Sequence, residues 1–126
     1  MMNDRTRTVI SAWAGFLAVA LGAFGAHGLK ATLLLHDTAA TWATASHYHL
    51  IHSVVLLALA LVGSGGRRSV WRTAWPIMLA GVVIFSGSLY VLSVTGLKWL
   101  GAITPIGGVL LLAAWAMLAI GAGKEK

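Results

Sequence analysis

The sequence predicts an all-α integral membrane protein, a four-helix bundle that forms a single domain over residues 1–126. Hydrophobic residues make up 59% of the chain and charged residues only 10%, whereas soluble domains are about 25% charged. Stretches without Asp, Glu, Lys or Arg cover 8–29, 38–66, 73–97 and 99–123. Each exceeds the ~18 apolar residues that mark a membrane-spanning helix. A water-soluble globule is therefore excluded.

The first span is predicted over residues 8–27, because about 20 residues at ~1.5 Å each cross one hydrocarbon core. Arg5 and Arg7 precede it and small residues occur at 23 and 25, a pattern that also fits a cleaved signal peptide. Signal peptides have a shorter apolar core of roughly 7–15 residues. An uncleaved span, followed by an outer loop over 28–40, is therefore favoured.

The remaining spans are predicted over 40–62, 70–94 and 99–122, separated by a Gly- and Ser-rich inner loop at 63–66 and a tight outer turn at 95–98. Every backbone polar group in lipid must be bonded within its own helix or barrel, and these stretches lack the alternation of barrel strands. Pro105 removes a helix hydrogen bond and disfavours helical geometry at Thr104. We expect a kink or break there; a static kink is favoured over a break whose carbonyls hold an ion.

Basic residues predict the orientation. The side with both termini and the middle loop carries seven Lys and Arg residues, and the other side carries two, Lys30 and Lys98. The positive-inside rule then places both termini in the cytoplasm. The seven are Arg5, Arg7, Arg67, Arg68, Arg72, Lys124 and Lys126. Because they lie at the ends of apolar runs, they indicate contact with lipid headgroups and not with nucleic acid.

Tryptophans at the ends of the spans fit aromatic belts at the headgroup level. Trp71 and Trp75 fall near the inner end of the third span, and Trp42 and Trp99 fall at outer ends. Trp115, in the middle of the fourth span, is expected to pack inside the protein.

Small residues recur every three or four positions in the first and last spans, notably Gly15 and Gly22 in one and Gly101 and Gly108 in the other. In lipid, close helix packing comes from such residues and not from Leu-rich faces. We expect these glycines to lie at helix contacts, within the bundle or between copies of the chain. The alternative is the general enrichment of glycine in membrane helices.

Polar residues inside the spans fall in the outer half of the membrane. Ionisable groups at that depth are costly and usually turn inward, so we expect His49 and His52 to face hydroxyl groups of the third and fourth spans. The candidate ligand- or proton-binding residues are His27, His49, His52, Ser86, Tyr90 and Thr104.

Three interpretations of these histidines stay open. Neutral imidazoles that hydrogen-bond to neighbouring helices are favoured. Binding of a proton or small ligand comes next, because histidine titrates near neutral pH. Metal or haem ligation is less favoured, because no Asp or Glu lies within a span, and the absence of Cys excludes thiolate sites and disulfides. The spans also contain no acid–base pair or phosphate-binding loop, which predicts a protein that is not an enzyme.

Four groups of strings resemble one known family: GAFGAHGL at 22–29, WATA at 42–45 with YHLIH at 48–52, FSGSLY at 85–90 and LGAITPIGG at 100–108. This is the domain-of-unknown-function family numbered 423, small bacterial inner-membrane proteins of the YgdD and YwdK kind, similar to eukaryotic transmembrane protein 256. The resemblance covers nearly the whole chain and implies four spans without an established activity. His27 and His52 match histidines of the family motifs. His49 falls where many members carry Gln, which favours a hydrogen-bonding role.

The first functional hypothesis is a non-enzymatic structural or interaction protein of the bacterial inner membrane, oligomeric through its glycine faces, with lipids as partners and no cofactor. The alternative is a small transporter or channel-like protein that binds a proton, ion or small solute in its outer polar layer. A third hypothesis is b-type haem binding, with His27 and His52 as axial ligands.

Overall fold

The computed structural model describes residues 2–63 and 69–124, and every regular element in these ranges is helical. The helices are α1 (Asp4–Ala26), α2 (Lys30–Leu35), α3 (Ala39–Gly63), α4 (Ser69–Thr95), the 3₁₀ helix η1 (Lys98–Ala102) and α5 (Thr104–Lys124). Four helical segments, the last made of η1 and α5, are long and apolar enough to cross a membrane. The predicted all-α membrane fold is confirmed.

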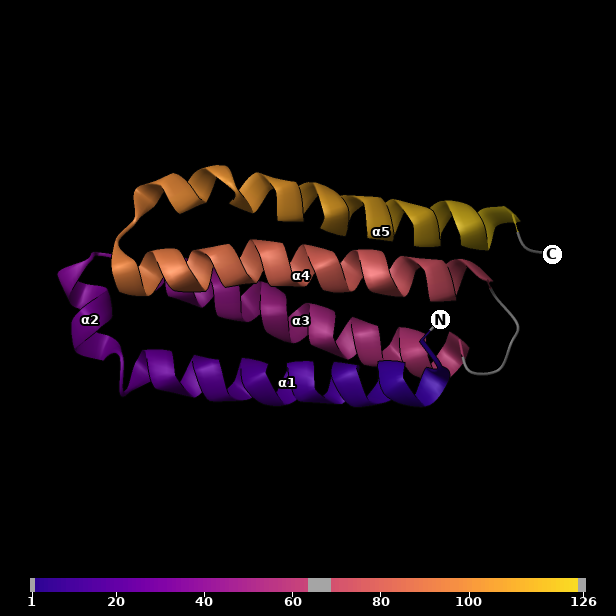
Figure 1. Ribbon diagram of the computed structural model, residues 1–126, viewed down its shortest axis with the longest axis horizontal. Helices are drawn as coiled ribbons and strands as arrows, with labels where there is room; N and C mark the ends of the chain where they lie inside the picture. The colour runs from indigo at the N-terminus through magenta and orange to yellow at the C-terminus, as the bar shows by residue number, and fades with distance from the viewer. Residues whose placement is uncertain (1, 64–68, 125–126) are drawn as a thin grey trace.

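The four long helices lie side by side, with α3 and α4 between α1 and α5 (Figure 1). Helix α1 packs on α3, α3 on α4, and α4 on α5, but no Cα atom of α1 lies within 8 Å of a Cα atom of α5. We call the end that holds both termini the terminal end and the opposite end, where α2 lies, the α2 end. The bundle is thus open, because its first and last helices are on opposite sides of the central pair.

Helix α1 begins before the predicted span, at Asp4. The side chain of Asn3 caps it by accepting a hydrogen bond from the backbone N–H of Thr6, at 2.8 Å. The charged first turn therefore continues the helix beyond the apolar segment. There Asp4 pairs with Arg7 at 3.4 Å and with Arg72 of α4 at 3.1 Å.

The fourth span is divided at Ile103, between η1 and α5. Pro105 is the second residue of α5, in the first turn, where a backbone N–H has no partner within the helix. Pro105 therefore marks the start of a helix and does not interrupt one. Pro76 does lie inside a helix, α4, where no kink was predicted.

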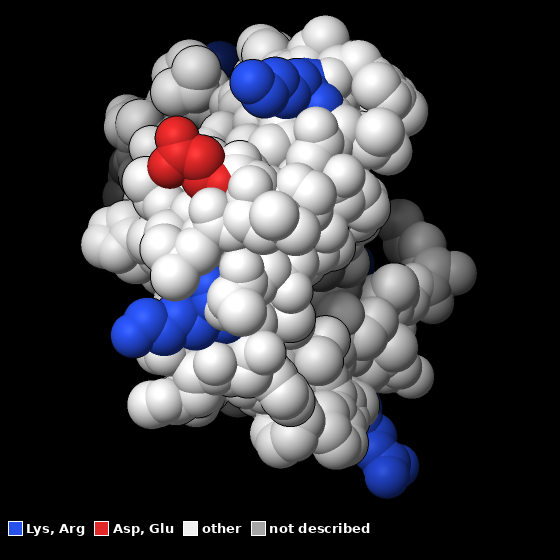
Figure 2. Space-filling model, turned by 90° about the vertical axis from the view of Figure 1, so that its left-hand side faces the viewer, with Lys and Arg blue, Asp and Glu red and all other residues white. Residues whose placement is uncertain are grey.

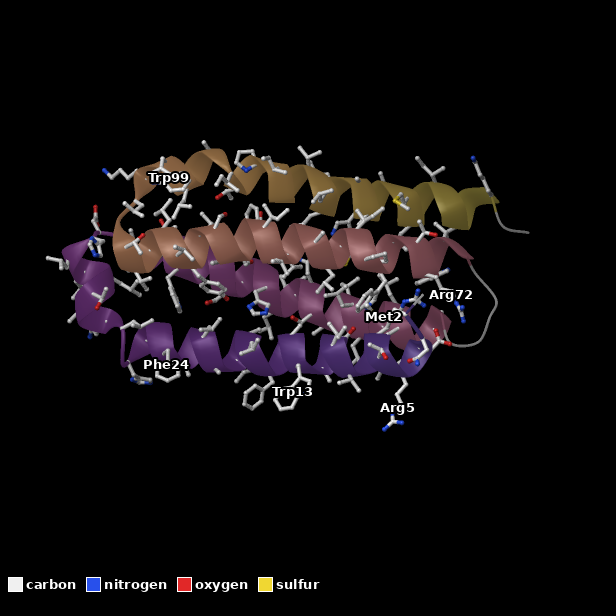
Figure 3. The ribbon with its side chains drawn as sticks, in the orientation of Figure 1. Met2, Arg5, Trp13, Phe24, Arg72 and Trp99 are labelled. Carbon is white, nitrogen blue, oxygen red and sulfur yellow. The ribbon has the colours of Figure 1, made fainter. Side chains whose placement is uncertain are left out.

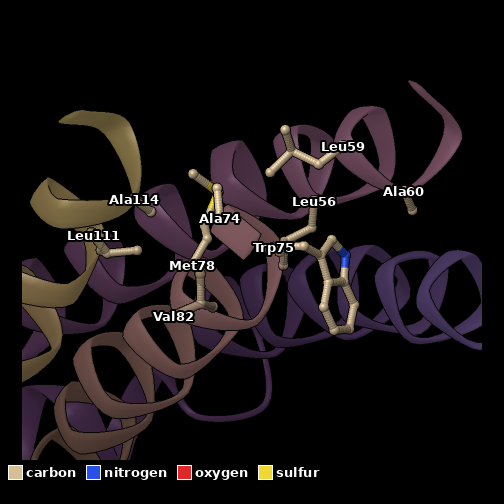
Figure 4. Packing of buried hydrophobic residues seen from close by; sticks show 9 residues of the cluster. All are labelled: Leu56, Leu59, Ala60, Ala74, Trp75, Met78, Val82, Leu111 and Ala114. Carbon is tan, nitrogen blue, oxygen red and sulfur yellow. The ribbon is translucent and has the colours of Figure 1, made fainter. Parts of the chain in front are cut away.

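An apolar core fills the half of the bundle toward the terminal end, where α3, α4 and α5 meet (Figure 4). Trp75 is part of this core, with only 1% of its surface exposed. Its indole N–H donates a hydrogen bond to the hydroxyl of Ser11 in α1, at 2.9 Å. Trp75 therefore packs inside the protein, where Ser11 gives the indole a partner, and does not face lipid. Its predicted depth at the headgroup level stays a prediction.

Large apolar side chains cover the outside of the bundle, as in a protein surrounded by lipid. Trp13, Phe24 and Trp99 are each more than half exposed, and Trp13 and Phe24 point away from the bundle (Figure 3). Figure 2 looks onto the α2 end and shows isolated charged side chains on an otherwise uncharged surface. Arg67, Arg68 and Lys126, which contribute to the predicted charge bias, lie outside the described residues, as do 64–66 of the predicted inner loop.

Candidate functional site in the polar layer

Five of the six candidate binding residues form a layer between the apolar core and the α2 end. We call His49, His52, Ser86, Tyr90 and Thr104 the polar layer. Tyr90 is partly buried, and each of the other four is at most 9% exposed. They come from the three helices α3, α4 and α5.

His49 joins three helices. Its Nδ1 lies 2.9 Å from the hydroxyl oxygen of Tyr90 in α4, and its other hydrogen-bond partner is the backbone of Ala14 in α1. A carbonyl can only accept a hydrogen bond, so a neutral ring carries its proton on Nε2 and accepts the Tyr90 O–H at Nδ1. Here the structure brings together two residues that the sequence placed at similar depth.

His52 has a different partner from the one expected. The indole N–H of Trp115 in α5 donates to His52 Nε2 at 3.0 Å. Because an indole nitrogen can only donate, Nε2 must be the acceptor, and the proton of a neutral ring resides on Nδ1. That nitrogen donates to the carbonyl of Tyr48, at 2.7 Å. Both ring nitrogens are therefore used within the protein.

The hydroxyl groups of the layer bond mainly to the backbone or to one another. Ser86 donates to the carbonyl of Ala45 in α3, at 2.8 Å. The Thr104 hydroxyl lies 2.6 Å from that of Ser88 in α4 and 3.3 Å from the carbonyl of Leu100. Ser86 and Thr104 thus hold helices together without contacting a histidine through a hydrogen bond.

His27 does not belong to the layer. It follows α1, its side chain is exposed, and its backbone N–H caps the helix at the carbonyl of Ala23. His52 lies about 20 Å along α3 from the α2 end, at ~1.5 Å per residue. The two rings are too far apart along the bundle to be axial ligands of one haem, whose ligands meet across a single iron. The described residues also contain no group of three or more His, Asp or Glu suited to a metal ion.

The four predicted packing glycines are not the positions where helices approach most closely. A Cβ at Gly15, Gly101 or Gly108 would make ordinary contacts at 3.7–3.9 Å, and one at Gly22 would meet nothing within 4 Å. Tighter approaches occur at other glycines, where a Cβ would come within 3 Å of a neighbour. These are Gly25, Gly81, Gly96, Gly107 and Gly121. The face of Gly22 is therefore free for a contact between copies, which stays a prediction.

Grooves open on the sides of the bundle. The α1–α3 groove, of about 590 Å³, is lined largely by small residues that include Ala18, Gly22 and Ala43. The α1–α4 groove, of about 410 Å³, contains His49, Ser86 and Tyr90. The α3–α5 groove, of about 450 Å³, contains His52 and Trp115. None of these linings includes Asp, Glu, Lys or Arg, so the grooves suit neutral groups.

Two bonds of this layer were not predicted from the sequence, the bond from Trp115 to His52 and the bond of Ser88 to Thr104. Trp115 carries a detectable signal, because an indole N–H in the middle of a span cannot reach water and needs an acceptor at its own depth. Ser88 carries none, because a serine in a membrane helix can also bond to its own backbone.

Comparisons with known proteins identify similar sequences. Residues 21–108 match the family described as "Protein of unknown function (DUF423)". The UPF0382 membrane protein YwdK of Bacillus subtilis is 43% identical over 118 residues, which cover 92% of this chain and 94% of the relative. The UPF0382 inner membrane protein YgdD of Escherichia coli K12 is 41% identical over 127 residues, which cover 99% and 95%. No solved structure matches this chain.

Proposed function

This chain belongs to the DUF423 family, an integral membrane family of unknown function, and we propose that it is a non-enzymatic structural or interaction protein of the bacterial inner membrane. One relative is named an inner membrane protein, which supports this location. The proposal also includes self-association, with lipids as the surrounding partners.

The observation that carries the proposal is that His52 is fully engaged by its own protein. Trp115 occupies one ring nitrogen and the Tyr48 carbonyl occupies the other. A proton, metal ion or haem iron would have to displace one of these bonds at membrane depth, where an unpaired polar group is costly. A structural role, in which the bond between His52 and Trp115 holds α3 to α5, needs no such displacement.

We place the contact between copies in the α1–α3 groove. Its small side chains allow the backbone of a second helix to approach closely, which is the main source of helix association in lipid. Gly22 lies in this groove with open space where a Cβ would be. A larger side chain there would block an incoming helix and leave the fold of one chain intact.

Gly22→Leu is therefore expected to shift the gently detergent-purified protein from its oligomeric mass to that of one chain. Native mass spectrometry measures this directly and would also reveal a retained non-lipid mass. The matched control is Gly87→Leu, which also adds a side chain at a glycine with no neighbour within 4 Å but lies in the α1–α4 groove. An unchanged oligomer in Gly22→Leu, with unchanged thermal stability, would count against the proposed contact.

We propose that both termini face the cytoplasm. Arg5, Arg7, Arg72 and Lys124 belong to the terminal end, and Lys30 and Lys98 to the α2 end, an asymmetry that follows the positive-inside rule. A reporter active only in the periplasm should stay silent when fused after Lys126 and become active when fused in the turn between α4 and η1. The reverse pattern would invert this orientation.

A small transporter or channel-like protein is the second candidate. The grooves beside His49 and His52 favour it, since a solute could approach either residue from the membrane. In this case the bond between His52 and Trp115 would have to open during transport, so substitutions that remove this bond should change the flux.

A further inference from the structure

The α1–α4 groove combines an apolar trough with a polar floor. Trp13, Leu17 and Val83 line the trough, while His49, Ser86 and Tyr90 supply the floor. Its volume of about 410 Å³ falls within the roughly 300–1,000 Å³ typical of small-molecule sites, which are mainly apolar with a few convergent polar groups.

The groove opens sideways to lipid. Trp13, Leu17 and Val83 are 59%, 50% and 62% exposed on the outside of the bundle. Gly87 also lines the groove and leaves open space where a side chain would be. Tyr90 and Ser86 lie about 8 and 14 Å from the α2 end of α4, at ~1.5 Å per residue. A molecule dissolved in one membrane leaflet can therefore enter with its polar group at the depth of these two residues.

The lining selects a neutral molecule. It contains no Asp, Glu, Lys or Arg, so an ionic group inside it would have no countercharge at a depth where charge is costly. A molecule with a chain and one uncharged polar group fits the trough and its floor.

The hydrogen bonds of the floor define that polar group. The Tyr90 O–H is donated to His49 Nδ1, the His49 Nε2 proton is directed to the Ala14 backbone, and the Ser86 O–H is donated to the Ala45 carbonyl. These side-chain donors are all used, and the Tyr90 oxygen also has Ser46 as a hydrogen-bond partner. The Ser86 oxygen is the acceptor of the floor that keeps its lone pairs. A bound molecule must therefore donate a hydrogen bond to this floor, which a ketone or an ether cannot do.

We propose that the α1–α4 groove binds a neutral, single-hydroxyl lipid, such as a long-chain alcohol, with its hydroxyl donating to the Ser86 oxygen and its chain between α1 and α4. Hydrocarbon offers a hydroxyl no acceptor, so the floor gives such a molecule a hydrogen bond that the surrounding lipid tails lack. This site is separate from the contact proposed at Gly22, which lies in the α1–α3 groove.

Photolabelling tests the site in the intact chain. The protein is placed in vesicles of phosphatidylethanolamine and phosphatidylglycerol with a hexadecanol analogue that carries a photoreactive diazirine in its chain. Labelling is expected on peptides of α1 and α4, and unlabelled hexadecanol should compete. Hexadecyl methyl ether has the same chain without a donor and should compete about fivefold less well, the loss expected for one net hydrogen bond. Equal competition by the ether would overturn the assignment.

Two variants separate the groove from the rest of the surface. Gly87→Leu fills the open space in the α1–α4 groove and is expected to abolish the competable labelling. Gly22→Leu changes an equally open glycine in the other groove and should leave the labelling unchanged, whatever happens to the oligomer. Thermal unfolding midpoints check that both variants are folded. Labelling of a folded Gly87→Leu protein at the wild-type level would overturn the proposed site.

Discussion

Gly107→Ala is expected to destabilise the bundle by about 3 kcal/mol, the upper part of the range for forcing extra atoms into a packed interior. A Cβ at Gly107 would overlap the backbone nitrogen of Phe85 and lie 2.8 Å from the Phe85 Cα and 2.9 Å from the carbonyl oxygen of Gly81. All three are backbone atoms of α4 and cannot rotate away as a flexible side chain could. The helices α4 and α5 would have to move apart.

Gly108→Ala is the matched control. It adds the same methyl group one residue later in α5, where a Cβ would make ordinary contacts of 3.8 and 3.9 Å with the Phe85 ring. Because both variants replace glycine by alanine in one helix, their change in helix propensity is nearly the same. Unfolding by SDS in detergent micelles, followed by far-UV circular dichroism, compares them. Equal stability of the two variants would show that the close approach of the α4 and α5 backbones at Gly107 does not contribute to the stability of the bundle.

This pair also shows what a small-residue pattern in a sequence can predict. The sequence indicated a close helix contact in the fourth span but assigned it to Gly108, whereas Gly107 faces the backbone of α4. Neighbouring residues differ by about 100° around a helix, and 107 and 108 are both glycine. Only the rotation of α5 about its axis, which packing on α4 determines, distinguishes them.

Helix boundaries were predictable where hydropathy determines them and less so where charges begin. The apolar segments correspond to the four long helical segments, because lipid leaves the backbone no other arrangement. The extension of α1 to Asp4 was missed, since a charged turn outside the bilayer is helical only through a cap and ion pairs with Arg7 and Arg72. The cap and the pair with Arg7 are local to α1, and only the pair with Arg72 depends on a neighbouring helix, α4.

The candidate site was predictable in its depth but not in all of its pairs. Counting residues from the ends of the spans placed His49 and Tyr90 in one half of the membrane, and they are hydrogen-bonded. The same reasoning led us to expect a hydroxyl partner for His52, which instead accepts a hydrogen bond from Trp115. The partner of His52 depends on the order of the helices in the bundle. Trp115 is in α5, which packs against α4 on the side away from α1.

His52→Leu is expected to destabilise the protein by about 2 kcal/mol, because it leaves the Trp115 N–H without its acceptor at membrane depth. Trp115→Phe should have a smaller effect, since it removes an N–H that donates to His52 and keeps an aromatic ring. If this bond joins α3 and α5, the double variant should be about 1 kcal/mol more stable than the two single effects predict together. The same SDS unfolding measurement gives all four values of this double-mutant cycle.

A second cycle gives the control, in which Trp13→Phe replaces Trp115→Phe. Trp13 is 59% exposed on α1 and has no contact with His52 among the described aromatic pairs, so its effect should add to that of His52→Leu. Additivity in both cycles would show that the bond between His52 and Trp115 does not stabilise the protein.

Flux measurements on the same variants separate the two functional candidates. Under the structural proposal, proton and solute flux into liposomes is the same for the wild type and the double variant. Flux that the wild type supports and the double variant loses would instead favour a transporter, because the substitutions remove the bond that must open during transport.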